Sequence, residues 1–130
     1  MKNNEKRLVL QVIGTDYLFQ LTEDFERKVM FEGNEYTVKV PKGFCTDMVS
    51  IPKPFWSWIS PFGKYQEAAV LHDFLYSFEG QLDGLDRTLT RKESDEFFYE
   101  VMVQDGVKKS KAKLMKNAVR TFGWKYWKKN

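Results

Sequence analysis

All four prolines of this chain fall within one short segment, residues 41–63, which also holds two of the eight glycines. Proline fixes φ and removes a backbone N–H donor, so neither a continuous strand nor a long helix is expected to run through this segment. The segment therefore separates two parts of the chain, and no single helix or strand is expected to extend from one part into the other. We expect an ordered loop here, with a helical turn near residues 54–59, and a long irregular loop in a compact domain is typical of a functional region.

The residues before this loop have the composition of β-strands. Four segments are rich in β-branched and aromatic side chains: 7–13, 17–21, 27–31 and 35–40. Gly33 and Asn34 separate the last two segments, and this pair is typical of a hairpin turn. We expect a small N-terminal antiparallel β-sheet or meander with one face left for helices to cover.

The residues after the loop show the apolar spacing of three helices, expected at about 64–78, 91–105 and 110–127. Thr90 and Glu93 match a capping box at the start of the second helix. The third helix is expected to turn five side chains toward the core: Ala112, Met115, Val119, Phe122 and Tyr126. Strands followed by helices predict one α+β domain over residues 1–130.

Composition indicates a soluble globular domain. The 130 residues are 42% hydrophobic and 16% aromatic, enough to build one compact core. The single cysteine, Cys45, rules out an internal disulfide, which fits a reducing compartment. No stretch approaches the roughly 20 apolar residues that span a bilayer, and the N-terminus makes a poor signal peptide. We expect a cytoplasmic protein with no transmembrane segment.

The net charge of +3 is unevenly distributed along the chain. Residues 108–130 contain nine basic residues and no acidic one, so the first 107 residues carry 12 basic against 18 acidic residues. A basic C-terminal helix can contact an anionic partner such as nucleic acid, a phosphate-bearing protein or a membrane surface. The alternative is that this helix docks on the acidic body of the same domain.

His72 is the only histidine in the chain, and a cluster of polar residues is expected around it. His72 and Tyr76 lie four residues apart and share a helix face. A hydrolytic histidine needs a carboxylate that accepts its Nδ1 proton while Nε2 takes a proton from water. Neighbouring side chains on one helix diverge, so Asp95 in the next helix is a better orienting partner than Asp73. We predict His72, Asp95 and Tyr76 as the catalytic group.

Asp73 is then available to bind a cation, together with Asp47 in the proline-rich loop. Carboxylates and loop carbonyls are hard oxygen ligands, which favours Ca²⁺ or Mg²⁺. One histidine and one cysteine do not make a usual structural zinc site. The structural alternative for Asp47 is a turn or cap in the loop.

The same loop offers four candidate binding residues, Thr46, Ser50, Trp56 and Trp58. The two hydroxyls have an alternative role inside turns, and the two tryptophans have an alternative role packed under the loop. Cys45 is either a thiolate nucleophile paired with a histidine or a small core thiol. His72 itself has the alternative of a buried ring that ties two helices together through Asp95.

Three stretches of the chain carry a resemblance to a known family: VPKGFCTDMVSIPKPFW at 40–56, GKYQEAAVLHDFLYS at 63–77 and RKESDEFFYEVM at 91–102. They resemble a family of small phage and prophage proteins that is catalogued only as a domain of unknown function. The resemblance covers roughly residues 36–125, with the motifs in order. It implies a phage-encoded protein in the host cytoplasm or in the virion, and it implies no activity.

A second resemblance is local. His-Asp-x-x-Tyr on a helix, with an aspartate on a following antiparallel helix, is similar to the core of secreted phospholipases A2. That resemblance implies water activation by His72, calcium binding by Asp73, and orientation of the histidine by Asp95 with help from Tyr76. The chain departs from those enzymes because it has no disulfides and lacks their glycine-rich calcium loop.

Two functions therefore remain open. The first is a metal-assisted hydrolase of an ester or lipid, with the His-Asp pair at its centre. The second is a non-enzymatic phage protein, either a minor virion or tail component or an inhibitor that binds a host defence factor. In the second case the polar cluster is structural, and the basic helix or the tryptophan loop binds the partner.

Overall fold

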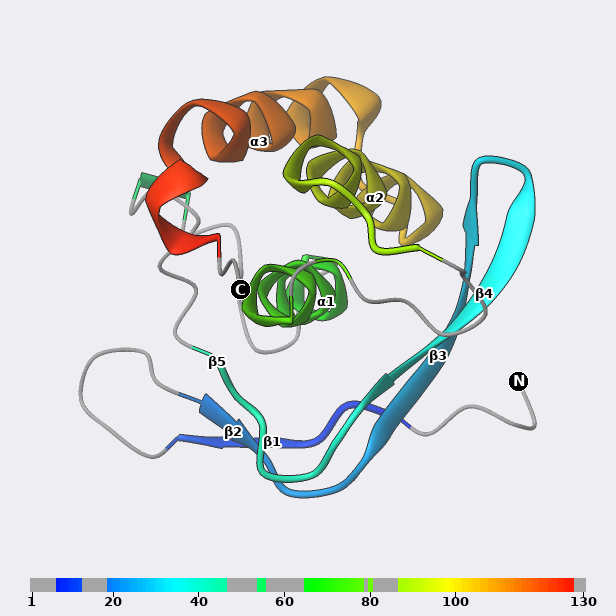
Figure 1. Ribbon diagram of the computed structural model, residues 1–130, viewed down its shortest axis with the longest axis vertical. Helices are drawn as coiled ribbons and strands as arrows, with labels where there is room; N and C mark the ends of the chain where they lie inside the picture. The colour runs from blue at the N-terminus through cyan, green and yellow to red at the C-terminus, as the bar shows by residue number, and fades with distance from the viewer. Residues whose placement is uncertain are drawn as a thin grey trace.

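The computed structural model describes residues 7–12, 19–46, 54–55, 65–78, 80 and 87–127. They form an antiparallel β region followed by three helices, which confirms the α+β prediction (Figure 1). The strands are β1 (Leu10–Val12), β2 (Phe19–Leu21), β3 (Phe25–Phe31), β4 (Asn34–Val40) and β5 (Cys45–Thr46). The helices are α1 (Gln66–Ser77), α2 (Arg91–Gln104) and α3 (Lys109–Phe122), and a 3₁₀ turn (Trp124–Tyr126) follows. Figure 1 shows α1 in the middle, between the strands and the pair α2 and α3.

The hairpin of β3 and β4 turns one residue earlier than its sequence predicts. Phe31 pairs with Asn34, so the two turn residues are Glu32 and Gly33, and the prediction of Gly33 and Asn34 is wrong. Their φ angles are 50° and 81°, and a two-residue turn of type I′ requires positive φ at both positions. Gly33 meets this requirement without strain, whereas Glu32 adopts it because the strand register demands it.

The proline-rich loop contributes a strand that its sequence did not predict. Thr46 and Cys45 in β5 pair antiparallel with Phe19 and Gln20 in β2, so that β1, β2 and β5 form a three-stranded sheet. Leu21 extends this contact, because its N–H donates to the carbonyl of Phe44 over 3.0 Å. The start of the loop is thereby attached to the N-terminal sheet, and β5 also contacts α1.

The core lies between the sheets and the helices, with α1 at its centre. Leu71 and Leu75 of α1 and Phe97 and Phe98 of α2 are completely buried. On α3 the predicted core stripe is confirmed at three positions, Ala112, Met115 and Val119. The prediction is wrong for Phe122, which is 59% exposed. Among the described residues, no helix is long and apolar enough to cross a membrane.

Phe122 is exposed because the third helix is shorter than predicted. The sequence prediction was 110–127, but α3 ends at Phe122 and Gly123 separates it from the 3₁₀ turn. The chain direction changes there, so Tyr126 does not continue the stripe and is only half-buried. The N-cap is Lys108, which makes no side-chain cap hydrogen bond.

The start of α2 is fixed by local contacts that place it against α1. The Thr90 hydroxyl accepts from the N–H of Glu93, and the Glu93 carboxylate accepts from the N–H of Thr90, each over 3.0 Å, which confirms the capping box. Just before it, the N–H of Leu89 donates to the carbonyl of Gly80 over 2.7 Å. Gly80 has φ +77°, and a Cβ there would lie 2.1 Å from the Leu89 carbonyl oxygen, so only glycine fits.

Candidate functional site

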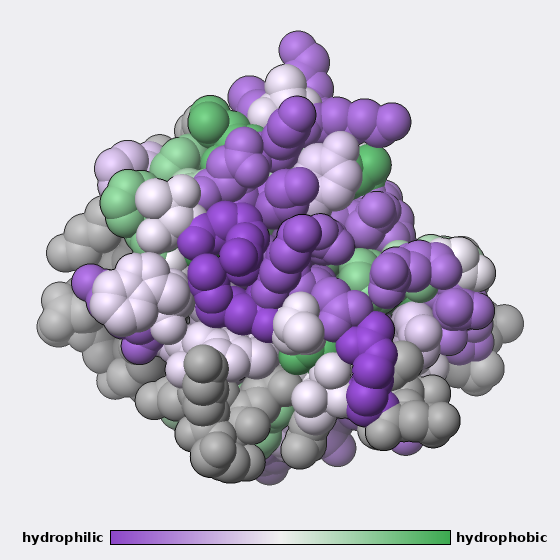
Figure 2. Space-filling view, turned by 45° about the horizontal axis from the view of Figure 1, so that its top comes forward, coloured by the Kyte–Doolittle hydropathy of each residue, from purple (hydrophilic) through white to green (hydrophobic). Residues whose placement is uncertain are grey.

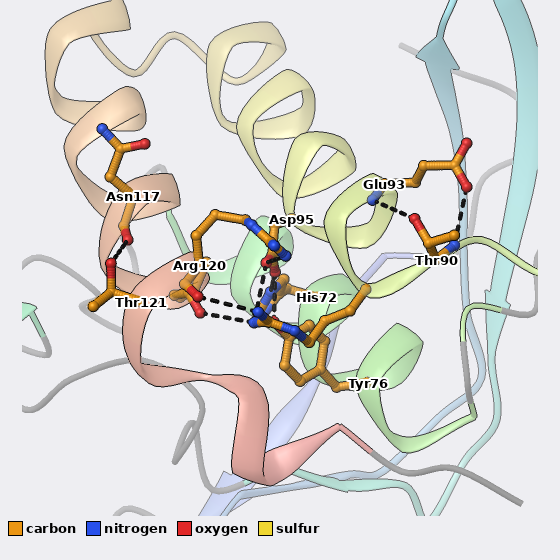
Figure 3. A network of polar contacts seen from close by, with 10 residues as sticks. His72, Tyr76, Thr90, Glu93, Asp95, Asn117, Arg120 and Thr121 are labelled. Atoms are coloured by element: carbon orange, nitrogen blue, oxygen red, sulfur yellow. Dashed lines mark hydrogen bonds and ion pairs between the residues drawn. The ribbon is translucent and has the colours of Figure 1, made fainter.

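Asp95 is the centre of a buried polar cluster in the first turns of α2 (Figure 3). Its carboxylate is 0% exposed. The Nε2 of His72 lies 2.7 Å from Oδ1 of Asp95, and the Tyr76 hydroxyl donates to the same oxygen over 2.7 Å. Both partners come from one face of α1, as the four-residue spacing predicts. The predicted catalytic group of His72, Asp95 and Tyr76 therefore lies together.

Two arginines complete the cluster. Nη1 of Arg120 on α3 donates to Oδ2 of Asp95 over 2.9 Å, and Nη1 of Arg91 on α2 lies 3.6 Å from the same oxygen. Arg91 also donates to the Tyr76 hydroxyl over 3.2 Å and to the backbone carbonyls of Val119 and Arg120 over 3.2 and 3.1 Å. The cluster therefore joins α1, α2 and the C-terminal turn of α3.

Aromatic rings enclose the histidine. The His72 ring lies between the rings of Tyr76 and Phe98, with centroid distances of 4.3 and 4.6 Å. Trp127 packs edge-on against Tyr76, at a centroid distance of 5.1 Å. His72 is 0% exposed and Tyr76 is 1% exposed. The imidazole is thus held in one orientation by rings on two sides and by a carboxylate at one nitrogen.

The surroundings keep Asp95 ionised. Burial alone would raise the pKa of Asp95, but hydrogen bonds from His72, Tyr76 and Arg120, with the charge interaction of His72, outweigh it and hold that pKa below its usual value. Burial, followed by the Asp95 carboxylate, raises the pKa of Tyr76, although Arg91 opposes this. The tyrosine hydroxyl therefore stays protonated and can donate to Asp95.

The ionised carboxylate also determines the tautomer of His72. A carboxylate has only acceptors, so Nε2 of His72 must carry the hydrogen in its contact with Asp95. In the neutral ring Nδ1 is then the basic nitrogen. The sequence-based expectation gave the two nitrogens the opposite roles and is wrong in this detail. It assumed a general arrangement, whereas the side chain leaves α1 with Nε2 nearest to α2.

Charged groups of both signs meet at Asp95. Asp95 carries one negative charge, but Arg120 and Arg91 lie within 4 Å of it and carry two positive charges. The arrangement can orient the His72 ring and can also hold three helices together.

The remaining predicted residues are placed as follows. Asp73 follows His72 on α1 and is half-buried. Thr46 is buried in β5, and its hydroxyl has no hydrogen-bond partner among the described residues. The other four predicted positions lie outside the described residues: Asp47, Ser50, Trp56 and Trp58. Within the described residues, no group of three or more His, Cys, Asp or Glu side chains is placed to hold a metal ion.

Cys45 is exposed in β5, with its Sγ 3.6 Å from the carbonyl oxygen of Gly43. The expectation of a small core thiol is therefore wrong. In β5 the side chains alternate, and Thr46 takes the buried side.

The two arginines of the cluster were not predicted from the sequence. Arg91 could have been found, because it lies four residues before Asp95 on the same helix, where opposite charges attract. Arg120 was counted only as one basic residue of the C-terminal helix. Its contact with Asp95 depends on how α3 packs on α2, and no local pattern in the sequence encodes that packing.

Comparison with known proteins gives a family but no activity. Residues 19–119 match the family described as "Protein of unknown function (DUF1353)". The chain is 36% identical over 108 residues to "Uncharacterized protein y4jT" of Sinorhizobium fredii (strain NBRC 101917 / NGR234), a match that covers 82% of this chain. It spans only 29% of that relative. No solved structure shows a significant match. The matched range includes His72, Tyr76, Arg91 and Asp95 but ends one residue before Arg120, and the chain belongs to the DUF1353 family.

Proposed function

We propose that the chain is a hydrolase that cleaves an ester bond, with His72 as the general base. The observation that supports this is the short hydrogen bond from Nε2 of His72 to Oδ1 of Asp95, 2.7 Å long, with the Tyr76 hydroxyl on the same oxygen. A carboxylate at one imidazole nitrogen raises the basicity of the other nitrogen and fixes its direction.

In the proposed reaction, Nδ1 of His72 takes a proton from a water molecule. The resulting hydroxide attacks the carbonyl carbon of the ester, and the tetrahedral intermediate collapses with loss of the alkoxide. The proton on Nδ1 passes to that alkoxide, so the alcohol and the acid leave and the histidine is again neutral. Asp95 accepts from Nε2 throughout, and Tyr76 holds Asp95 in place.

Calcium or magnesium is part of this proposal, because a cation would polarise the ester carbonyl. Asp73 is the described residue best suited to hold it, since its carboxylate is a hard ligand one position after His72. Asp47 is the second proposed ligand. The proposed substrate is an ester of host lipid or envelope, and the proposed setting is a phage-encoded protein in the host cytoplasm or in the virion.

The substitution His72→Gln tests the base directly. A glutamine amide can still donate to Asp95, but it cannot take a proton from water. We expect hydrolysis of short-chain p-nitrophenyl esters and of phosphatidylglycerol to fall by about 10²–10⁴-fold, while the free energy of unfolding changes little. Lys92→Gln, an exposed change on α2, is the matched control and should leave the rate unaltered.

Three results would contradict the proposal: no ester hydrolysis by the unmodified chain, hydrolysis that survives His72→Gln, or hydrolysis that Lys92→Gln removes equally. The metal is tested separately. Proton NMR of the single imidazole is followed against pH with and without calcium, and a bound cation near Asp73 should shift its titration. Resonances that do not respond to calcium would remove the metal from the proposal.

A second function is favoured by a different observation, which is the complete burial of His72 and Asp95. A base with no exposed surface cannot meet a substrate unless the helices separate locally. With two arginines also balancing the carboxylate, the cluster suits a structural histidine. The second proposal is therefore a non-enzymatic phage protein that binds a virion component or a host defence factor. An imidazole that never titrates between pH 5 and 9, together with a lack of hydrolysis, would support it.

A further inference from the structure

Among the described residues, the large apolar side chains with the highest exposed fractions lie in the C-terminal part of the chain. Three of the five large hydrophobic side chains that are exposed among the described residues lie there: Leu114 at 52%, Phe122 at 59% and Trp124 at 66%. Leu114, Ala118 and Phe122 are spaced by four, so they form one stripe along α3 beside its buried stripe. Clustered exposure of this kind marks an interaction surface more often than isolated exposed residues do.

The segment that carries this stripe is rich in basic residues. Positions 108–127 contain seven basic residues and no acidic one. Lys111 is exposed three residues before Leu114, on the side of α3 that carries the stripe, and Lys125 is exposed directly after Trp124. Figure 2, which looks onto the side of α3, shows hydrophilic residues across the middle of this face and hydrophobic residues along its edge. Long lysine side chains can lie along apolar surface and keep their ammonium groups at a polar boundary.

We propose that this surface binds the face of an anionic lipid bilayer. We call it the α3 patch, and it consists of Leu114, Phe122, Trp124, Lys111 and Lys125. A helix with leucine and aromatic side chains beside lysines can place its apolar groups at the boundary of the acyl chains and its ammonium groups among anionic headgroups. Tryptophan suits this position because its ring is apolar and its indole N–H is polar.

Two other occupants fit the α3 patch less well. In a symmetric dimer the same patch faces itself, so Lys111 and Lys125 would approach lysines of the second copy, and the patch itself contains no acidic residue to pair with them. Nucleic acid would satisfy the lysines through its phosphates, but it would leave Leu114 and Phe122 without an apolar environment. A bilayer satisfies both kinds of side chain. The proposal is independent of the hydrolase, because it uses neither His72 nor Asp95.

Co-sedimentation of the full chain with vesicles tests the proposal. Vesicles of phosphatidylcholine mixed with phosphatidylglycerol are compared with vesicles of phosphatidylcholine alone, and only the first should bind the chain. Phe122→Ser combined with Trp124→Ser should weaken this binding by more than about ten-fold, because two large apolar groups are lost from the boundary. Met30→Ser removes a side chain that is 47% exposed on β3, and this matched control should bind like the unmodified chain.

The charge is tested with Lys111→Glu combined with Lys125→Glu, which should weaken binding by about ten-fold or more at low salt. Thermal unfolding of each variant checks that the fold is retained. The proposal is overturned if the unmodified chain ignores phosphatidylglycerol vesicles, or if only the charge variant loses binding, which would indicate a general polyanion surface. It is also overturned if sedimentation velocity shows a dimer that the Phe122 and Trp124 changes dissociate.

Discussion

Two buried ion-pair clusters connect the elements of this fold, and their central charges have opposite signs. Asp95 is a carboxylate among arginines. Arg27, on the buried side of β3, is a guanidinium among carboxylates, because it donates to Glu67 of α1 over 2.9 Å and to Asp105 at the end of α2 over 2.8 Å. Burial would lower the pKa of Arg27, but Asp105 and Glu67 raise it. Each centre is ionised because its partners outweigh the cost of burial.

The two clusters differ in whether water can reach the partner groups once the central residue is removed. The partners of Arg27 reach water, since the side chain of Asp105 is 18% exposed and that of Glu67 is 39% exposed. Asp95 holds two groups, His72 and Tyr76, that have essentially no exposure. Water can replace a lost contact only where it can reach the group. The Asp95 cluster is therefore expected to be the more sensitive of the two.

The largest expected effect belongs to Asp95→Ala. This change strands two buried donors and separates two arginines from their counter-ion, so we expect the free energy of unfolding to fall by about 3–5 kcal/mol. Urea unfolding followed by circular dichroism measures it. Asp95→Asn is the matched control, and because it keeps an acceptor for His72 or Tyr76 it should cost less. A loss below about 1 kcal/mol for the alanine variant would show that the cluster contributes little.

Arg27→Leu is expected to cost less than Asp95→Ala. Leucine suits the apolar face of β3, and the carboxylates of Glu67 and Asp105 can turn toward water. We expect the free energy of unfolding to fall by about 1–3 kcal/mol in the same urea experiment. If this loss equals or exceeds that of Asp95→Ala, then access to water does not explain the difference between the clusters.

Lowering the pH should reduce the stability that the Asp95 cluster contributes to the fold. The pKa of Asp95 in the folded chain lies below its ordinary value of 3.8. Ionised Asp95 therefore contributes its stability above pH 3.8, and this contribution is lost as the pH falls from 3.8 toward the folded pKa. We expect the free energy of unfolding to depend less on pH in this range in Asp95→Asn than in the unmodified chain. Parallel curves would contradict the lowered pKa.

The smallest expected effect belongs to a carboxylate nearer the surface, Glu93. Its hydrogen bond with Arg87, then that with the Thr90 backbone, lowers its pKa from 4.5 to about 2. The stability that it contributes is present above pH 4.5 and is lost between pH 4.5 and about 2. Arg87 is 55% exposed, so solvent weakens the pair. We expect Glu93→Gln to cost about 0.5–1 kcal/mol at neutral pH, since glutamine can still cap Thr90. Arg87→Gln should give a similar loss, and a clearly larger loss for Glu93→Gln would mean that capping dominates.

The parts of the fold that the sequence predicts are those controlled by short-range rules. The capping box at Thr90, the helix face shared by His72 and Tyr76, and the existence of each long strand all follow from spacing within a few residues. The partnership of Asp95 with His72 needed one further assumption, that consecutive helices pack antiparallel. The spacing alone does not require that arrangement, because 13 residues (78–90) separate α1 from α2.

The parts that the sequence does not predict depend on contacts between distant segments. Cys45 and Thr46 form β5 only because β2 offers an edge, and two residues carry no strand periodicity of their own. The turn at Glu32 follows from the strand register, which outweighs the local preference for the Gly33 and Asn34 pair. Arg120 meets Asp95 only after α3 has docked.

The contacts of Arg91 have a consequence for motion in the helical half. The end of an α-helix leaves carbonyl groups without helical partners, and such ends ordinarily open and close on their own. In α3 the carbonyls of Val119 and Arg120 are held by the guanidinium of Arg91 from another helix. The last turn of α3 can therefore unwind only when its contact with α2 also breaks. Its amide hydrogens should exchange with deuterated solvent almost as slowly as those in the centre of α1, so that the terminal turn behaves as part of the cooperative unit.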